Sequence, residues 1–108
     1  SWKSWPFPHY LQCNGTYGND TMGVPNQNSD STICGQGCAM TSVSMGMAGL
    51  GLNINGKYPD PNLLNEWLRN NNGYTCIDGN CNNLVLWKID DISGGHLVVT
   101  DNQSLTHP

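Results

Sequence analysis

Two residues of this 108-residue chain have the types and settings that could do chemistry, Cys38 and His96. Cys38 follows a flexible Gly35-Gln36-Gly37 turn, and apolar residues recur behind it at helical spacing, at Met40, Val43, Met47 and Leu50. Unpaired N–H groups and the macrodipole at a helix N-terminus favour an anion, and the thiolate is the nucleophilic form of cysteine. His96 follows Gly94-Gly95 and precedes an apolar β-branched run. A cysteine on an early helix and a histidine on a late strand are what a thiol hydrolase needs.

The five cysteines, at positions 13, 34, 38, 76 and 81, are an odd number, which suggests pairs plus one free thiol. Cys76 and Cys81 enclose a short loop in which Asp78-Gly79 is a turn signal, so we expect these two to be bridged. Cys13 would then pair with Cys34 and leave Cys38 free. Disulfides place a protein in an extracellular or secretory compartment.

Two other arrangements of these cysteines stay open at this point. Cys34 could instead pair with Cys38, which would leave Cys13 as the free thiol. Cys34-x3-Cys38 and Cys76-x4-Cys81 could also hold zinc, although these spacings lie at or beyond the edge of the structural-zinc range. We therefore expect disulfides and no metal or other cofactor.

The composition restricts the classes of partner. The net charge is −4 with only four basic residues, which argues against a nucleic-acid binder. Charged residues make up 11% of the chain, well below the roughly 25% that is typical of soluble domains, and uncharged polar residues take their place. No apolar run is long enough to span a membrane, and no signal peptide is visible at the start.

Three sites match the acceptor pattern for N-glycosylation. They are Asn14-Gly15-Thr16, Asn19-Asp20-Thr21 and Asn102-Gln103-Ser104. Glycans there would require a secreted protein.

The remaining pattern predicts one α+β domain. Residues 1–9 contain aromatic and proline residues typical of an extended segment, and residues 10–108 form the domain. We expect helices over residues 38–50, ended by Gly51, and from Pro61, capped by Asp60 and stopped by the asparagines at 70–72. Residues 84–89 fit a strand or a short helix, and residues 96–100 fit a strand. Helices first and strands later suggest helices packed on a small antiparallel sheet.

Several segments, taken in order, resemble the C39-like peptidase domain, a compact branch of the papain-like cysteine peptidases. The segments are Tyr10-Leu11-Gln12, Tyr17-Gly18-Asn19, Met22-Gly23, Thr32-Ile33-Cys34, Gly37-Cys38-Ala39-Met40-Thr41-Ser42, residues 63–68 (LLNEWL) and residues 95–100 (GHLVVT). The similarity covers nearly the whole chain from Tyr10 onward, and the signature around Cys38 is its most specific part.

The resemblance implies a papain-like fold and a thiol hydrolase acting on a peptide or protein. Cys38 would be the nucleophile, His96 the general base and acid, and Gln12 a donor to the oxyanion together with the Cys38 N–H. The residue that orients the histidine is unassigned. Asp101 faces away from His96 along an extended strand, Asn102 would need a turn, and His107 stands where the family usually has a carboxylate.

The sequence thus favours a secreted cysteine peptidase and leaves two rivals. The first is a catalytically impaired C39-like domain that is an extracellular structural protein and self-associates through open sheet edges. The second is a carbohydrate-binding module, because tryptophan and asparagine suit sugars, although nothing in the sequence places them on one face.

Overall fold

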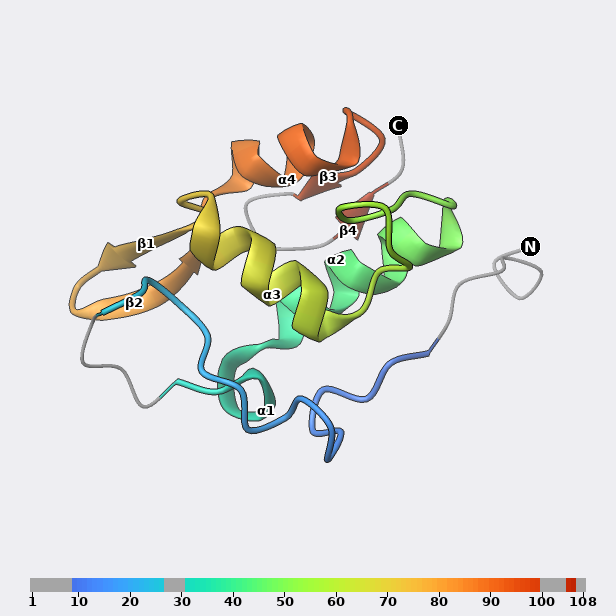
Figure 1. The fold of residues 1–108 in the computed structure, drawn as a ribbon. Coiled ribbons are helices and arrows are strands. Elements are labelled where there is room, and N and C mark those ends of the chain that lie inside the picture. Colours follow the sequence, from blue (N-terminus) through green and yellow to red (C-terminus); the bar gives the residue numbers. More distant parts are fainter. Residues whose placement is uncertain (1–8, 27–30, 100–104, 107–108) are drawn as a thin grey trace.

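The computed structural model describes residues 9–26, 31–99 and 105–106, and within them the chain is a small α+β domain. The elements in order are α1 (Ile33–Gln36), α2 (Cys38–Gly49), α3 (Pro61–Asn70), β1 (Tyr74–Ile77), β2 (Asn80–Leu84), α4 (Leu86–Ser93), β3 (Val98–Val99) and β4 (Leu105–Thr106). Figure 1 shows the β3–β4 ladder between α4 and α2, with α3 packed on α2 and the β1–β2 hairpin extending from the end of α3.

The two long helices begin and end where the sequence predicts. α2 starts at Cys38 and ends one residue earlier than expected, and Gly51 adopts a left-handed φ of 74° directly after it. At the start of α3 the Asp60 carboxylate accepts the Leu63 N–H at 2.8 Å, and Pro61 occupies the first turn.

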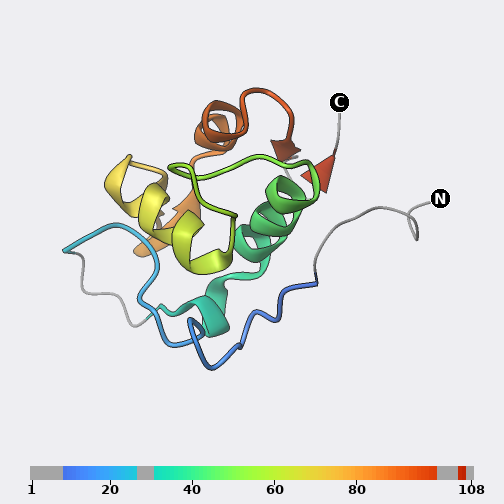
Figure 2. The ribbon, with the colours of Figure 1, turned by 45° about the vertical axis from the view of Figure 1, so that its right-hand side comes forward.

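One core joins all the helices. Buried apolar side chains of α2 and α3 meet residues from α1, α4 and the loops, and the cluster is Tyr17, Met22, Ile33, Met40, Val43, Met47, Ile54, Leu64, Leu68, Tyr74, Leu84, Ile89 and Leu97. The segment of residues 9–26 runs past α1, as Figure 2 shows from a second side. It is fastened there by backbone bonds such as Ile33 N–H to Asp20 O at 3.1 Å.

The second half of the chain departs from the expected order of elements. Residues 74–84 form an antiparallel hairpin between α3 and α4, so the strands do not all follow the helices. Its turn is Asp78-Gly79, with φ of 52° and 84°, and these positive values at both central residues are those of a tight hairpin turn. Residues 84–89, where strand and helix both fitted, contain the end of β2 and the start of α4.

The strand expected over residues 96–100 is shorter than predicted, and His96 is not part of it. α4 ends in a turn in which Gly94 and Gly95 have φ of 62° and 81°, and the His96 N–H donates to Ser93 O at 3.2 Å. A residue whose N–H closes a helical turn is not available to a strand ladder, so the strand begins only at Val98. Thr100 and residues 1–8 of the expected N-terminal segment lie outside the described residues.

Candidate functional site

Both expected disulfides are present, and they leave one thiol. Cys13 is bonded to Cys34 and Cys76 to Cys81, while Cys38 is free and exposed. Cys34 is therefore not paired with Cys38. A zinc site made of Cys34, Cys38, Cys76 and Cys81 is excluded in this structure, because three of these sulfurs are in disulfides and cannot act as thiolate ligands. Two disulfides are compatible with an extracellular protein.

Cys38 is the first residue of α2, and a break in the helix sets it there. Gly37 separates α1 from α2, and its backbone lies so close to α1 that a Cβ on it would be 2.5 Å from Ile33 O. Only glycine fits this approach without a shift of the chain. The first helical bond of α2 runs from Thr41 N–H to Gly37 O at 2.8 Å, so the N–H groups of Cys38, Ala39 and Met40 have no acceptor within α2.

Gln12 is bonded to α1, the turn of helix that precedes Cys38. Its side-chain Nε2 donates to Cys34 O at 2.7 Å, and the Cys13–Cys34 disulfide holds the neighbouring backbone in place. In an unbroken helix Cys34 O would accept the Cys38 N–H. Among the described residues that bond is not formed, so the Cys38 N–H has no backbone acceptor. Gln12 Nε2 thus donates to the carbonyl oxygen that the Cys38 N–H would use in an unbroken helix.

His96 is placed elsewhere. It is exposed, in the turn that follows α4, and its position is fixed by the Ser93 bond and by the burial of Leu97. Both ribbon views show the start of α2 beside α1, and the turn between α4 and β3 well away from it, on the other side of α2 (Figures 1 and 2). The structure thus bonds Gln12 to Cys34 O, four residues before Cys38, and places the turn that contains His96 away from the start of α2.

The orienting residue also cannot be assigned from the structure. Asp101, Asn102 and His107 lie outside the described residues, as does the acceptor pattern that begins at Asn102. Of the other acceptor sites, Asn19 is exposed, and half-buried Asn14 accepts the Thr16 N–H through its Oδ1 at 2.7 Å. That bond uses the side-chain oxygen of Asn14 and does not involve its Nδ2, the atom to which a glycan would be attached.

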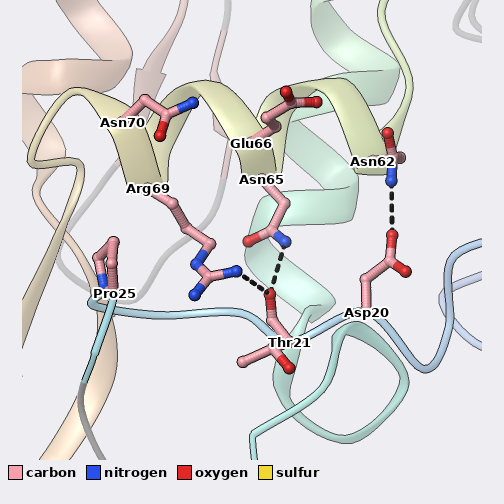
Figure 3. A pocket seen from close by; sticks show the side chains of 8 residues that line it. All are labelled: Asp20, Thr21, Pro25, Asn62, Asn65, Glu66, Arg69 and Asn70. Carbon is pink, nitrogen blue, oxygen red and sulfur yellow. Dashed lines mark hydrogen bonds between the residues drawn. The ribbon is translucent and has the colours of Figure 1, made fainter.

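The structure reveals a groove that the sequence reasoning missed, between α3 and the segment of residues 20–25. It has a volume of about 460 Å³ and is lined by Asp20, Thr21, Pro25, Asn62, Asn65, Glu66, Arg69 and Asn70 (Figure 3). The five α3 residues recur at intervals of three and four, which is the spacing of one polar helix face. That periodicity could have identified the helix side of the groove, but nothing local indicates which loop closes it.

Hydrogen bonds attach the two walls of this groove to each other. Asn65 Nδ2 and Arg69 Nη1 both donate to Thr21 O, at 2.9 and 3.4 Å, and Asn62 Nδ2 donates to the Asp20 carboxylate at 2.5 Å. Buried Tyr74 donates its hydroxyl to Asn65 Oδ1 at 2.8 Å. Burial raises the pKa of Tyr74, and the nearby Arg69 charge partly opposes the rise. Tyr74 therefore stays a neutral donor that fixes the Asn65 amide.

Comparison of this chain with protein-family models, with curated proteins and with solved structures finds no match. No helix in residues 9–26 or 31–99 has the length and apolar character needed to cross a bilayer.

Proposed function

We propose that the chain is a secreted thiol hydrolase of the papain-like type, a cysteine peptidase with Cys38 as its nucleophile. The observation that supports the proposal is the free and exposed thiol of Cys38 at the start of α2, where the Cys38 N–H has no backbone acceptor among the described residues and Gln12 Nε2 is bonded to Cys34 O. The Gln12 amide has two N–H groups, and only one of them is used by Cys34 O. The other is free to donate to an oxyanion.

The chemistry follows from these groups. The Cys38 thiolate attacks the carbonyl carbon of a peptide bond, and the carbonyl oxygen gains the negative charge. Gln12 Nε2 and the Cys38 N–H stabilise that charge as donors. The leaving amine takes a proton from an acid when its bond to carbon breaks, and water then releases the acyl group from the sulfur. The proposal assigns the acid and base role to His96, by resemblance to the C39-like domain.

The assignment of His96 has to be tested separately, because its turn lies apart from the start of α2. The test compares His96→Ala with His9→Ala, since both histidines are exposed. Turnover of a fluorogenic peptide library and the rate of Cys38 alkylation by iodoacetamide are measured for each. Activity and rapid alkylation lost in His96→Ala and kept in His9→Ala support the assignment. Equal behaviour of the two variants removes His96 from the mechanism.

Gln12 offers a test that does not depend on the histidine. Gln12→Ala should lower kcat about 10²–10³-fold, which is typical of removing one oxyanion donor. Gln36→Ala is the matched control, because Gln36 is an exposed amide of α1 with no side-chain hydrogen bond among the described residues. A wild-type protein that cleaves no peptide of the library and reacts slowly with iodoacetamide contradicts the whole proposal.

The separation of His96 from Cys38 favours a second function, that of a catalytically impaired extracellular domain with a structural role. The β1–β2 hairpin is a sheet of two strands. Val24 N–H donates to Cys81 O on β2 at 2.7 Å, whereas β1 has an unpaired outer edge within the described residues. Ile77 on β1 and Trp87 on α4 are 55% and 64% exposed. Unpaired edges and exposed apolar side chains favour pairing between copies. Light scattering that shows assembly with rising concentration, prevented by Ile77→Lys, would support this function.

A further inference from the structure

A second hollow lies on the other side of the α3 crest from the groove. Its volume is about 250 Å³, and Leu63 and Trp67 form its apolar wall. Asn55, Lys57, Glu66 and Asn70 contribute polar groups around it. We call it the Trp67 pocket. A tryptophan and several asparagines line this one pocket. The sequence alone did not show that these residues lie together.

The polar groups of the Trp67 pocket are largely unused within the protein. Among the described residues, the side chains of Lys57, Glu66 and Asn70 form no hydrogen bond or ion pair. Lys57 and Glu66 carry opposite charges and line the same hollow, yet they are not paired across it. Asn71 gives its Nδ2 to Trp67 O at 2.8 Å and keeps its Oδ1 as a free acceptor. Donors and acceptors are thus both available to a ligand.

The charges around both hollows favour a neutral ligand. Among the lining residues, Lys57 balances Glu66 in the Trp67 pocket, and Arg69 balances Asp20 in the groove. Lys88 lines neither hollow, and its ammonium lies 6.0 Å from the centre of the Trp67 ring. The net charge of −4 on the whole chain also disfavours anions. Hydroxyl groups donate and accept at once, so they can pair with ammonium, carboxylate and amide groups alike. A sugar ring adds an apolar C–H face that can pack against the indole.

The two hollows are joined at their edge. Glu66 and Asn70 line both of them. Figure 3 shows these two side chains on the outer side of α3, while Asn65 and Arg69 reach down from the helix to Thr21. A ligand that fills the Trp67 pocket and continues past Glu66 and Asn70 enters the groove without leaving polar surface. An extended chain of sugar units has this shape, whereas a single ring occupies one hollow.

We propose that the surface formed by the Trp67 pocket, the Glu66–Asn70 crest and the adjoining groove binds a neutral oligosaccharide. One sugar ring packs beside Trp67, and the following units lie along α3. This site is separate from Cys38 and does not depend on the proposed peptidase function.

The test is a titration of the 108-residue chain, labelled with ¹⁵N, with cellotriose, maltotriose and triacetylchitotriose in turn. At least one trisaccharide should shift the Trp67 indole N–H and the Asn70 side-chain amide signals in a saturable way. Its affinity should exceed that of its own monosaccharide about tenfold, because a second unit adds hydrogen bonds in the groove. Asn70→Ala and Glu66→Gln should each weaken binding about tenfold, and both side chains are exposed, so the fold is retained.

Asn53→Ala is the matched control, since Asn53 is exposed and lines neither hollow. It should bind like the wild type. The proposal is overturned if no trisaccharide gives saturable shifts at these signals, or if Asn53→Ala weakens binding as much as Asn70→Ala does. It is equally overturned if leucine, a zwitterion, saturates the pocket while the sugars do not, because the unpaired Lys57 and Glu66 would then bind charged groups.

Discussion

Removing the Cys13–Cys34 disulfide should destabilise the protein more than removing Cys76–Cys81. The two bridges span 21 and 5 positions of the sequence. In the chain-entropy model a bridge lowers the conformational entropy of the unfolded chain. The loss grows with the logarithm of the number of residues in the loop that the bridge closes. The expected losses in unfolding free energy are about 3.4 kcal/mol for the longer loop and about 2.2 kcal/mol for the shorter one. A domain of this size has about 5–15 kcal/mol in total, so both losses are measurable.

The structure indicates that the two losses in unfolding free energy should differ by more than the chain-entropy model gives. The Cys13–Cys34 bridge holds the segment of residues 9–26 against α1, and buried Tyr17 and Met22 belong to that segment. The Cys76–Cys81 bridge joins two strands in which only Tyr74 and Leu84 are buried. Losing the first bridge therefore loosens part of the core, whereas losing the second loosens a surface hairpin.

Urea unfolding followed by circular dichroism measures both effects. Each bridge is removed as an alanine pair in a Cys38→Ser background, because a free thiolate could exchange with the remaining disulfide during the experiment. The background protein is the reference. Equal losses for the two pairs, or a larger loss for the Cys76–Cys81 pair, would refute the reasoning, as would a loss below about 1 kcal/mol for the Cys13–Cys34 pair.

Three further predictions concern single residues. Asp60→Ala removes the cap of α3 and should cost about 1 kcal/mol in urea unfolding, whereas Asp60→Asn should cost much less; equal losses would argue against capping. Gly37→Ala should cost about 1–3 kcal/mol because its Cβ meets the Ile33 carbonyl, while Gly15→Ala, with open space around it, should be nearly neutral. Burial, with nearby Tyr58 and Asp60, raises the pKa of Tyr10 to about 12. Since the unfolded value is about 10, the stability from this proton is full below about pH 10 and is lost as the pH rises through about 12. Absorbance titration should therefore show one tyrosine fewer ionising near pH 12 in Tyr10→Phe, and an unchanged curve would contradict this assignment.

Much of the local structure could be predicted from short stretches of sequence. Asp60-Pro61 marks the start of α3, Gly51 follows the end of α2, and Asp78-Gly79 forms the hairpin turn. Each signal depends on a few neighbouring residues, because caps and turns are set by local hydrogen bonds and by allowed φ values. The Cys76–Cys81 disulfide could be predicted in the same way, from the turn between the two cysteines. The Cys13–Cys34 pair followed only if Cys38 was taken as the free thiol.

The element around residues 84–99 could not be predicted in this way. Leu84 ends a strand and Leu86 begins a helix, although the apolar run between them looks uniform. The conformation of this run depends on packing, since Leu84 enters the core from β2 and Ile89 enters it from α4. Gly94 and Gly95 precede His96 in the sequence, but only the fold shows that they close a helical turn there.

The sequence by itself indicated that one thiol is left over, favoured Cys38 for it, and determined where the long helices begin. These properties depend on cysteine count, local capping and order along the chain. Only the tertiary structure decided that Gln12 bonds to Cys34 O, that the turn between α4 and β3 lies away from the start of α2, and that Trp67 and several asparagines line one pocket. Such distances depend on how α2, α3 and α4 pack over the core, and no short-range signal contains that information.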